Sequence, residues 1–159
     1  MIRSATHSDA PAIWGIIGPV IRAGDTYALD RDMSETDAIA YWLADDHHCF
    51  VAESDGTLLG TYYLKRNQGG GGSHVCNCGF MVSQEARGQG IARSMCEHAL
   101  DTARSLDFTA MQFNFVVSTN RAAIGLWEKL GFATVGRLPR AFNHPSEGMV
   151  DALIMYKQL

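Results

Sequence analysis

An apolar segment leads into a helical pattern along the following stretch: Val82-Ser83-Gln84-Glu85-Ala86-Arg87-Gly88-Gln89-Gly90-Ile91-Ala92. It predicts that a strand ends near Val82, that the chain turns through Gly88 and Gly90, and that an amphipathic helix follows. Backbone N–H groups at such a turn point to one place, and the positive end of the helix adds to them. Because glycine lacks a Cβ atom, the backbone can approach a ligand closely. The segment is therefore typical of a pyrophosphate-binding loop, with a plain strand-to-helix turn as the alternative.

This loop departs from two familiar phosphate-binding motifs. A Walker loop requires Gly-Lys-Ser or Gly-Lys-Thr, and the only lysines are Lys65, Lys129 and Lys157, so that motif is excluded. A dinucleotide fingerprint requires a third glycine where this chain has Arg93. Asp107 lies about 20 residues beyond the loop, as that fingerprint demands, and keeps a nicotinamide-binding module open as an alternative.

A second motif follows the next strand. It reads Asn120-x-x-Ala123-x-x-Leu126-Trp127-x-Lys129-x-Gly131-Phe132 and predicts a helix over Asn120–Leu130, with Ser118 or Thr119 as its N-cap and Gly131 as its terminator. Together with Arg87-x-x-Gly90-x-Ala92, it resembles the acetyl-CoA-binding core of the GNAT acyltransferase superfamily. The resemblance covers Cys49–Phe132 in motif and the whole chain in element order.

The rest of the pattern alternates strands and helices. A hairpin turn is indicated at Ser54-Asp55-Gly56, and four consecutive glycines make Asn67–Ser73 a flexible loop with no element of its own. The last two strands are joined by Phe142–Gly148. The strands are expected at Ile2–Thr6, Cys49–Glu53, Thr57–Lys65, His74–Val82, Thr109–Val117, Ala133–Arg140 and Val150–Leu159, and the other helices between Asp9 and Gly24, from Ser34 to Leu43, and over Gly90–Ser105.

This pattern predicts an α/β (α+β) fold with a mixed sheet and helices on both of its faces. The resemblance implies in addition that the sheet is mainly antiparallel and that it splays at its centre. The chain, residues 1–159, is expected to form one domain of this kind.

Composition narrows the class of protein. The chain is 47% hydrophobic and 19% charged, which excludes a disordered chain, a collagen-like chain and a coiled coil. No apolar run has the roughly 18 residues that a membrane helix needs, and the N-terminus does not resemble a signal peptide. The net charge of -4 argues against nucleic acid as a partner. We expect a cytoplasmic protein that binds no membrane, with a homodimer as a possible assembly.

The four cysteines are Cys49, Cys76, Cys78 and Cys96, and without a signal peptide they are expected to be reduced. Cys76, Cys78 and His74 would share one face of a strand and so imitate three zinc ligands. Structural zinc sites favour a Cys-x-x-Cys spacing and a fourth ligand, and neither is visible. No metal is expected.

The resemblance implies how acetyl-CoA would bind. The strand that contains Phe80, Met81 and Val82 would offer a free backbone edge to the pantetheine arm, because an unpaired edge can accept a ligand as an added strand. The Val82 N–H would polarise the thioester carbonyl. Asn120 would hydrogen-bond the arm, although it could instead satisfy its own helix start. The pyrophosphate would lie on Arg87, Gly88, Gln89, Gly90, Ile91 and Ala92.

The catalytic residues implied are Asn120, Trp127 and Asn114. Many members of the family carry a tyrosine where this chain has Trp127, and that tyrosine is proposed to protonate the departing thiolate. An indole N–H only donates a hydrogen bond and does not ionise near neutral pH, so Trp127 cannot be that acid. The general base is unassigned among polar residues that include Glu85, Asp25, His74 and His144. Tyr27, Asn77 and Asn143 are expected to bind the acceptor.

The function implied is an N-acetyltransferase that moves acetyl from acetyl-CoA to a small amine by direct attack in a ternary complex. Leu138–Leu159 and Gly24–Tyr27 also resemble a branch that acetylates small amines, including proline analogues. The acidic loop Asp25–Asp32 favours a cationic or zwitterionic acceptor, namely an amino acid, an analogue of one or an amine toxin. Because Trp127 replaces the tyrosine, a catalytically silent acyl-CoA-binding domain remains an alternative.

Overall fold

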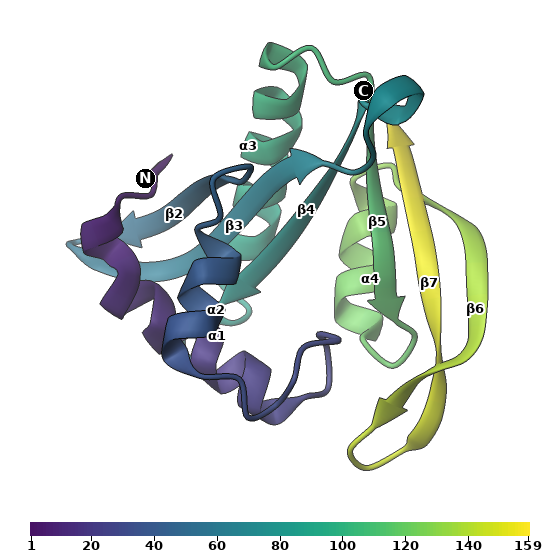
Figure 1. Cartoon of the computed structure of the whole chain (residues 1–159), viewed down its shortest axis with the longest axis horizontal. Coiled ribbons are helices and arrows are strands. Elements are labelled where there is room, and N and C mark those ends of the chain that lie inside the picture. The colour runs from purple at the N-terminus through teal and green to yellow at the C-terminus, as the bar shows by residue number, and fades with distance from the viewer.

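Seven strands form one sheet in the order β1-β2-β3-β4-β5-β7-β6 in the computed structural model, which describes all residues 1–159 (Figure 1). Every neighbouring pair is antiparallel except β4 and β5, which are parallel. The predicted mixed, mainly antiparallel sheet is therefore confirmed. The strands are β1 (Ile2–Ser4), β2 (His48–Ser54), β3 (Thr57–Arg66), β4 (Val75–Val82), β5 (Ala110–Val117), β6 (Ala133–His144) and β7 (Gly148–Gln158).

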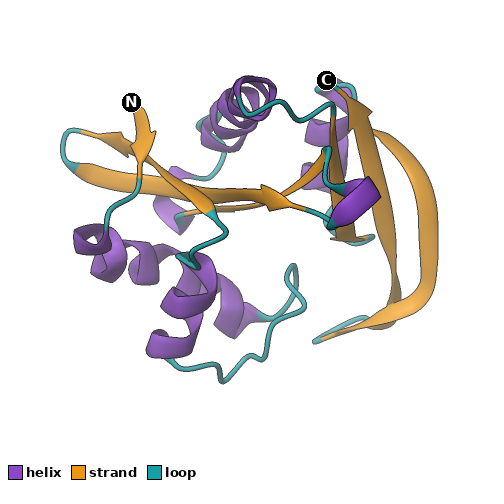
Figure 2. Ribbon diagram, turned by 45° about the horizontal axis from the view of Figure 1, so that its top comes forward, coloured by secondary structure: helices purple, strands orange, loops and turns teal.

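Helices cover both faces of the sheet, as predicted (Figure 2). The helices α1 (Ala10–Ala23) and α2 (Glu35–Trp42) pack on one face, and α3 (Ile91–Ser105) and α4 (Arg121–Lys129) pack on the other. Successive side chains of a strand face opposite sides, so β4 contributes to both cores. Cys76 and Cys78 lie in the core beneath α3, whereas Met81 lies in the core beneath α1. None of the helices combines the length and apolar character needed to cross a lipid bilayer.

The sheet is open between β4 and β5. The two strands pair only at Val75 with Ala110 and at Cys76 with Met111, and beyond that point they diverge (Figure 1). The next residue, Asn77, is buried, and its side-chain Nδ2 donates to the Gln112 carbonyl across a distance of 2.9 Å. The side-chain amide therefore occupies a β5 acceptor where the backbone ladder stops. This divergence is the splay that the resemblance implied.

Two expected boundaries are wrong at the C-terminal hairpin and at α4. Strand β6 does not end at Arg140 but pairs again from Phe142 to His144, after an irregular stretch between Leu138 and Phe142. Arg140 has a positive φ of 53°, which breaks the ladder locally and makes the sequence look like a strand end. The N-cap of α4 is Asn120 rather than Ser118 or Thr119, because the Asn120 side chain accepts a hydrogen bond from the Ala123 N–H at 3.3 Å.

The glycine-rich loop Asn67–Ser73 is not free of structure. Gly70–Gly72 form a single 3-10 turn, in which the Gly72 N–H donates to the Gly69 carbonyl at 3.0 Å. Gly70 takes a positive φ of 53°, which glycine adopts without a steric cost. The expectation of a segment with no element of its own is therefore wrong in this respect.

A buried hydrogen-bond chain ties α2 to the sheet. The Trp42 indole Nε1 donates to Thr61 Oγ1 at 2.9 Å, and the Thr61 hydroxyl donates to the Phe50 carbonyl at 2.9 Å. Trp42 and Thr61 are both fully buried. A buried donor without a partner loses its hydration and gains no hydrogen bond in return. This pair of hydrogen bonds therefore fixes where α2 docks.

The substitution Thr61→Val, which keeps the side-chain shape, is expected to lower the free energy of unfolding by about 1–3 kcal/mol, because it leaves the Trp42 N–H unpaired. Urea unfolding followed by circular dichroism measures this loss. The matched control is Thr57→Val, at an exposed position of the same strand. If Thr61→Val were as stable as the control, the hydrogen bonds of Thr61 would not hold α2 in place.

Candidate functional site

Two adjoining cavities lie where β4 and β5 diverge. The larger has a volume of about 480 Å³, and we call it the loop-side cavity because Arg87 and Ala92 of the glycine loop line it. The smaller has a volume of about 320 Å³, and we call it the aromatic cavity because tyrosine, phenylalanine and tryptophan rings dominate its wall. The residues that line both are Thr26, Tyr27, Phe80, Asn120, Ala123 and Trp127.

The glycine loop has the backbone geometry expected of an anion site. Gly88 and Gly90 have positive φ angles of 76° and 81°, and a Cβ atom at either position would meet nothing within 4 Å. Gly90 is the N-cap of α3 and provides no side chain to cap its first turn. The N–H groups of that turn therefore remain available to a ligand.

Not every predicted residue of the loop contributes its side chain to the cavity. Arg87 and Ala92 line the loop-side cavity, whereas Gly88, Gln89, Gly90 and Ile91 do not. Gln89 folds back, and its Nε2 donates to the Glu85 carbonyl at 2.8 Å. Ile91 packs against the hydrophobic core beneath α3. What these four positions can offer a ligand is backbone.

The edge of β4 that faces the opening is unpaired from Cys78 onward. The Asn67 N–H donates to the Val75 carbonyl and the Ser83 N–H donates to the Leu59 carbonyl, so the odd-numbered residues of β4 direct their backbone groups at β3. The N–H and C=O groups of Phe80 and Val82 therefore face the opening. Phe80, Met81 and Val82 all line the loop-side cavity.

Tyr27 connects the loop between α1 and α2 to this free edge. Its hydroxyl donates to the Phe80 carbonyl at 2.9 Å, and it is the only titratable side chain that lines both cavities. Burial raises the pKa of the Tyr27 hydroxyl well above its ordinary value. The phenol therefore stays protonated near neutral pH and acts as a hydrogen-bond donor. A carbonyl oxygen has two lone pairs, so Phe80 can accept a second hydrogen bond from a ligand.

Asn120 lines both cavities, and the oxygen and the nitrogen of its side-chain amide can make separate hydrogen bonds. Its Oδ1 accepts the hydrogen bond from the Ala123 N–H, so the helix-start alternative raised by the sequence is correct for that atom. Its Nδ2 donates to no protein group and is left for a ligand. One end of the amide therefore caps α4, and the other end is a free donor at the junction of the cavities.

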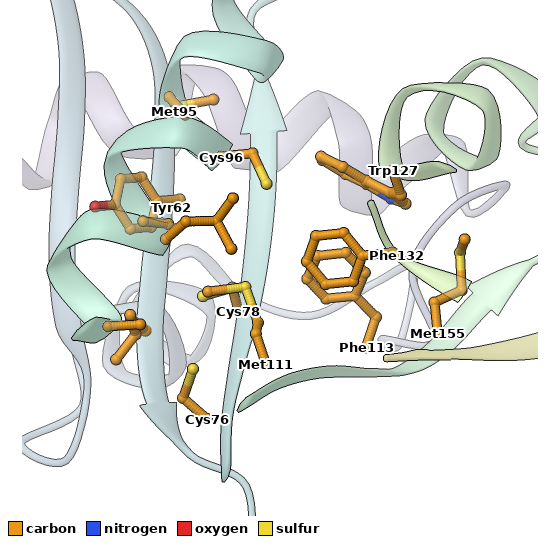
Figure 3. Packing of buried hydrophobic residues seen from close by; sticks show 14 of the residues in the cluster. Tyr62, Cys76, Cys78, Met95, Cys96, Met111, Phe113, Trp127, Phe132 and Met155 are labelled. Carbon is orange, nitrogen blue, oxygen red and sulfur yellow. The ribbon is translucent and has the colours of Figure 1, made fainter. Parts of the chain in front are cut away.

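Trp127 is a packed aromatic side chain at the same junction. It is 8% exposed, and its ring centre lies 5.1 Å from that of Phe113 and 5.3 Å from that of Phe80. Figure 3 shows it reaching from α4 toward the Phe113 and Phe132 rings, which stack on each other. Its indole N–H donates to no protein acceptor. Packing and positioning are the tasks that this geometry supports.

The polar residues of the aromatic cavity lie on the central strands. Asn77 and Asn114 both line it, and Asn114 is held by Asn67, whose Oδ1 accepts from the Asn114 Nδ2 at 2.6 Å. Lys65 is the only charged side chain in the wall, and no carboxylate or imidazole lines it. Of the acidic loop, only the uncharged residues Thr26–Leu29 reach this cavity.

Some predicted residues lie elsewhere. Asn143, His74 and Glu85 line neither cavity, whereas Asp25 and His144 line the loop-side cavity. His144 follows Asn143 on β6, and adjacent residues of a strand face opposite sides, so only one of the pair can reach the site. The structure gathers no group of three or more metal-ligating side chains.

Two residues of β3 that line the aromatic cavity, Tyr63 and Lys65, are not among the site residues predicted from the sequence. The available signal was the alternation of side chains along Thr57–Lys65, which places Tyr63 and Lys65 on one face. Tyr63 also explains Gly79 of β4. A Cβ atom at Gly79 would lie 2.6 Å from the Tyr63 ring, so that ring needs a glycine beneath it.

Comparison with known proteins agrees with this geometry. The profile of the acetyltransferase (GNAT) family matches residues 21–132. The N-acetyltransferase aca1 of Schizosaccharomyces pombe is 33% identical, over 84% of this chain and 72% of that protein. A GCN5-related N-acetyltransferase from Kribbella flavida is 37% identical and superposes with a TM-score of 0.95, over 100% of this chain and 97% of that one.

A more distant structure was solved with acetyl-CoA. It is a phosphinothricin acetyltransferase from Sinorhizobium meliloti, 20% identical, with a TM-score of 0.88 over 100% of this chain and 88% of that one. At that identity the likeness concerns the fold, and the fold is the splayed sheet described above. The family profile and the relative from S. pombe together establish that this chain belongs to the GNAT family and is an acetyl-CoA-dependent N-acetyltransferase.

Proposed function

We propose that this enzyme acetylates the amine of a small molecule, an amino acid or an analogue of one, by direct transfer while both substrates are bound. The observation that carries the proposal is the junction of the two cavities at Phe80, Asn120 and Trp127. A thioester at that junction would meet an amine that enters from the aromatic cavity. Its volume of about 320 Å³ suits a small molecule rather than a peptide.

The residues present fit acetyl-CoA in two respects. The free backbone edge at Phe80 and Val82 can pair with the amides of the pantetheine arm as an added strand would. The space beside Gly88 and Gly90, with Arg87 next to it, can take the pyrophosphate. Asn120 Nδ2, at the junction of the two cavities, would donate to the arm. Acetyl-CoA supplies the activated acetyl group, and the protein supplies its alignment with the amine.

The residues around the junction indicate which groups could remove a proton from the amine. No carboxylate or imidazole lines the aromatic cavity, and Tyr27 stays protonated, whereas Asp25, His144 and Glu147 line only the adjoining loop-side cavity. We therefore infer that the amine attacks in its neutral form and that its proton leaves through solvent after attack. The thiolate of CoA is a stable leaving group near neutral pH, so it needs no dedicated acid at Trp127.

A Cβ atom at Gly90 tests the pyrophosphate site. Gly90→Val would place a branched side chain in the open space that the ligand needs, and it should raise the acetyl-CoA dissociation constant at least about tenfold. Titration calorimetry measures this. Gly56→Val is the matched control, because Gly56 has a comparable positive φ of 77° and open surroundings in the distant β2–β3 turn. Equal affinity in both folded variants would place the pyrophosphate elsewhere.

Trp127→Phe tests the role of the indole. If Trp127 packs and positions, the variant should keep kcat within about tenfold and change mainly KM. Steady-state kinetics with acetyl-CoA and a small amine gives both constants, and Trp14→Phe on α1, outside both cavities, is the control. A loss of kcat on the order of a thousandfold with intact acetyl-CoA binding would instead mean that the indole N–H acts in the transition state.

The acceptor class is tested by offering free amino acids, simple amines and a lysine-rich peptide with acetyl-CoA. A thiol reagent reports release of CoA, and mass spectrometry identifies the N-acetylated product. Free amino compounds should be turned over faster than the peptide, because only they fit the aromatic cavity. Faster turnover of the peptide would contradict the proposal, and so would acetyl-CoA binding with no transfer to any amine.

The pH dependence tests the absence of an enzyme base. The value of kcat/KM should rise with pH as the acceptor amine loses its proton and should level off above the pKa of that amine. Two acceptors with amine pKa values of about 8 and about 10 should therefore give rising limbs about two pH units apart. A limb that stays at one pH for both acceptors would mean that a group of the protein removes the proton.

A further inference from the structure

We propose that Lys65 forms an anion-binding subsite in the aromatic cavity, so that the preferred acceptor carries a carboxylate or a similar anionic group together with its amine. This inference rests on the proposed function and names which small amines the site takes. Lys65 is half-buried and is the only charged residue among those that line the cavity. None of the ion pairs of the protein includes it.

The position of Lys65 directs its charge into the cavity. On β3 it shares a face with Tyr63, and its Nζ lies 6.0 Å from the centre of the Tyr63 ring. It pairs in register with Asn77 of β4, so both side chains stand on the same face at the closed end of the splay. A cation held against aromatic rings without a carboxylate partner has lost part of its hydration, and an anionic ligand would restore that loss.

No carboxylate forms an ion pair with Lys65, and the carboxylate of this region, Asp46, is exposed and lies 3.7 Å from His47 Nε2. His47 stacks on Tyr63 with ring centres 4.4 Å apart, and its pKa is lowered, mainly by burial and also by Lys65. The imidazole is therefore neutral at pH 7, and Lys65 is the cation of this region. The hydroxyls of Tyr41 and Tyr63 lie 3.2 Å apart and bond to each other. Asn77 and Asn114 add polar amides to the same end of the cavity.

This arrangement gives the aromatic cavity two different ends. Lys65, Asn77 and Asn114 belong to the aromatic cavity alone, whereas Phe80, Asn120 and Trp127 are shared with the loop-side cavity where the thioester would lie. An acceptor with its anionic group at Lys65 would direct its amine to the shared end. Because the cavity is only about 320 Å³ in volume, both groups must be on one small molecule, as they are in an amino acid.

The test compares acceptors that differ only in the anionic group: an amino acid that the wild type acetylates and the primary amide of the same amino acid. The wild type should prefer the amino acid. Lys65→Met should raise KM for the amino acid about tenfold or more, leave KM for the amide nearly unchanged, and leave the acetyl-CoA dissociation constant unchanged. Lys65→Arg should restore much of the preference, and Lys65→Glu should favour the amide.

Two further measurements separate this subsite from a general packing effect. A carboxylic acid that matches the amino acid but lacks its amine should bind to the wild type in calorimetry and bind at least about tenfold more weakly to Lys65→Met. Lys129→Met, which removes an exposed lysine of α4 outside both cavities, should behave as the wild type throughout.

The outcomes distinguish the two proposals. If the wild type acetylates small amines but Lys65→Met changes the amino acid and its amide equally, the subsite is refuted and the proposed function stands. An unchanged preference in Lys65→Met refutes the subsite in the same way. If the wild type binds acetyl-CoA and acetylates no small amine, the proposed function fails and the subsite fails with it.

Discussion

The site depends on the end of the backbone pairing between β4 and β5. After Cys76 the two strands separate, and the Asn77 side chain donates to the Gln112 carbonyl instead of letting the ladder continue. Everything functional lies beyond that point: the free edge at Phe80 and Val82, and the two cavities that meet between the strands. An open sheet edge is normally a liability, and in this protein the open edge of β4 faces the loop-side cavity and bonds to the Tyr27 hydroxyl through the Phe80 carbonyl.

The separation also assigns different chemistry to the two sides of the junction. The loop-side cavity has Arg87 in its wall, and the left-handed glycines Gly88 and Gly90 follow Arg87 at the start of α3, an arrangement that suits phosphate groups. The aromatic cavity has rings, amides and a single cation. Tyr27 couples the two sides, since its loop closes the aromatic cavity while its hydroxyl bonds to the β4 edge. Under the proposed function, catalysis is the alignment of an amine with a thioester.

The parts that the sequence predicts are those with local causes. Gly88, Gly90 and Gly131 were readable because left-handed backbone requires glycine, and the helix starts and apolar alternation gave the element order. The return of β6 to its ladder at Phe142 was not readable, because it depends on pairing with β7 across an irregularity. Alternation along β3 places Lys65 on one face with Tyr63, but which side chains from β4, β5 and α2 surround it depends on how those elements pack, and no local pattern encodes that.

Amide hydrogen exchange on binding of acetyl-CoA tests whether the ligand pairs with the open edge of β4, because it monitors single residues along that edge. If the ligand pairs with that edge, the N–H groups of Phe80 and Val82 should become protected, while that of Met81, which already faces β3, should change little. This alternating pattern is specific to strand-like pairing. Protection that is absent at Phe80 and Val82, or equal at all three residues, would mean that acetyl-CoA does not pair with this edge as a strand.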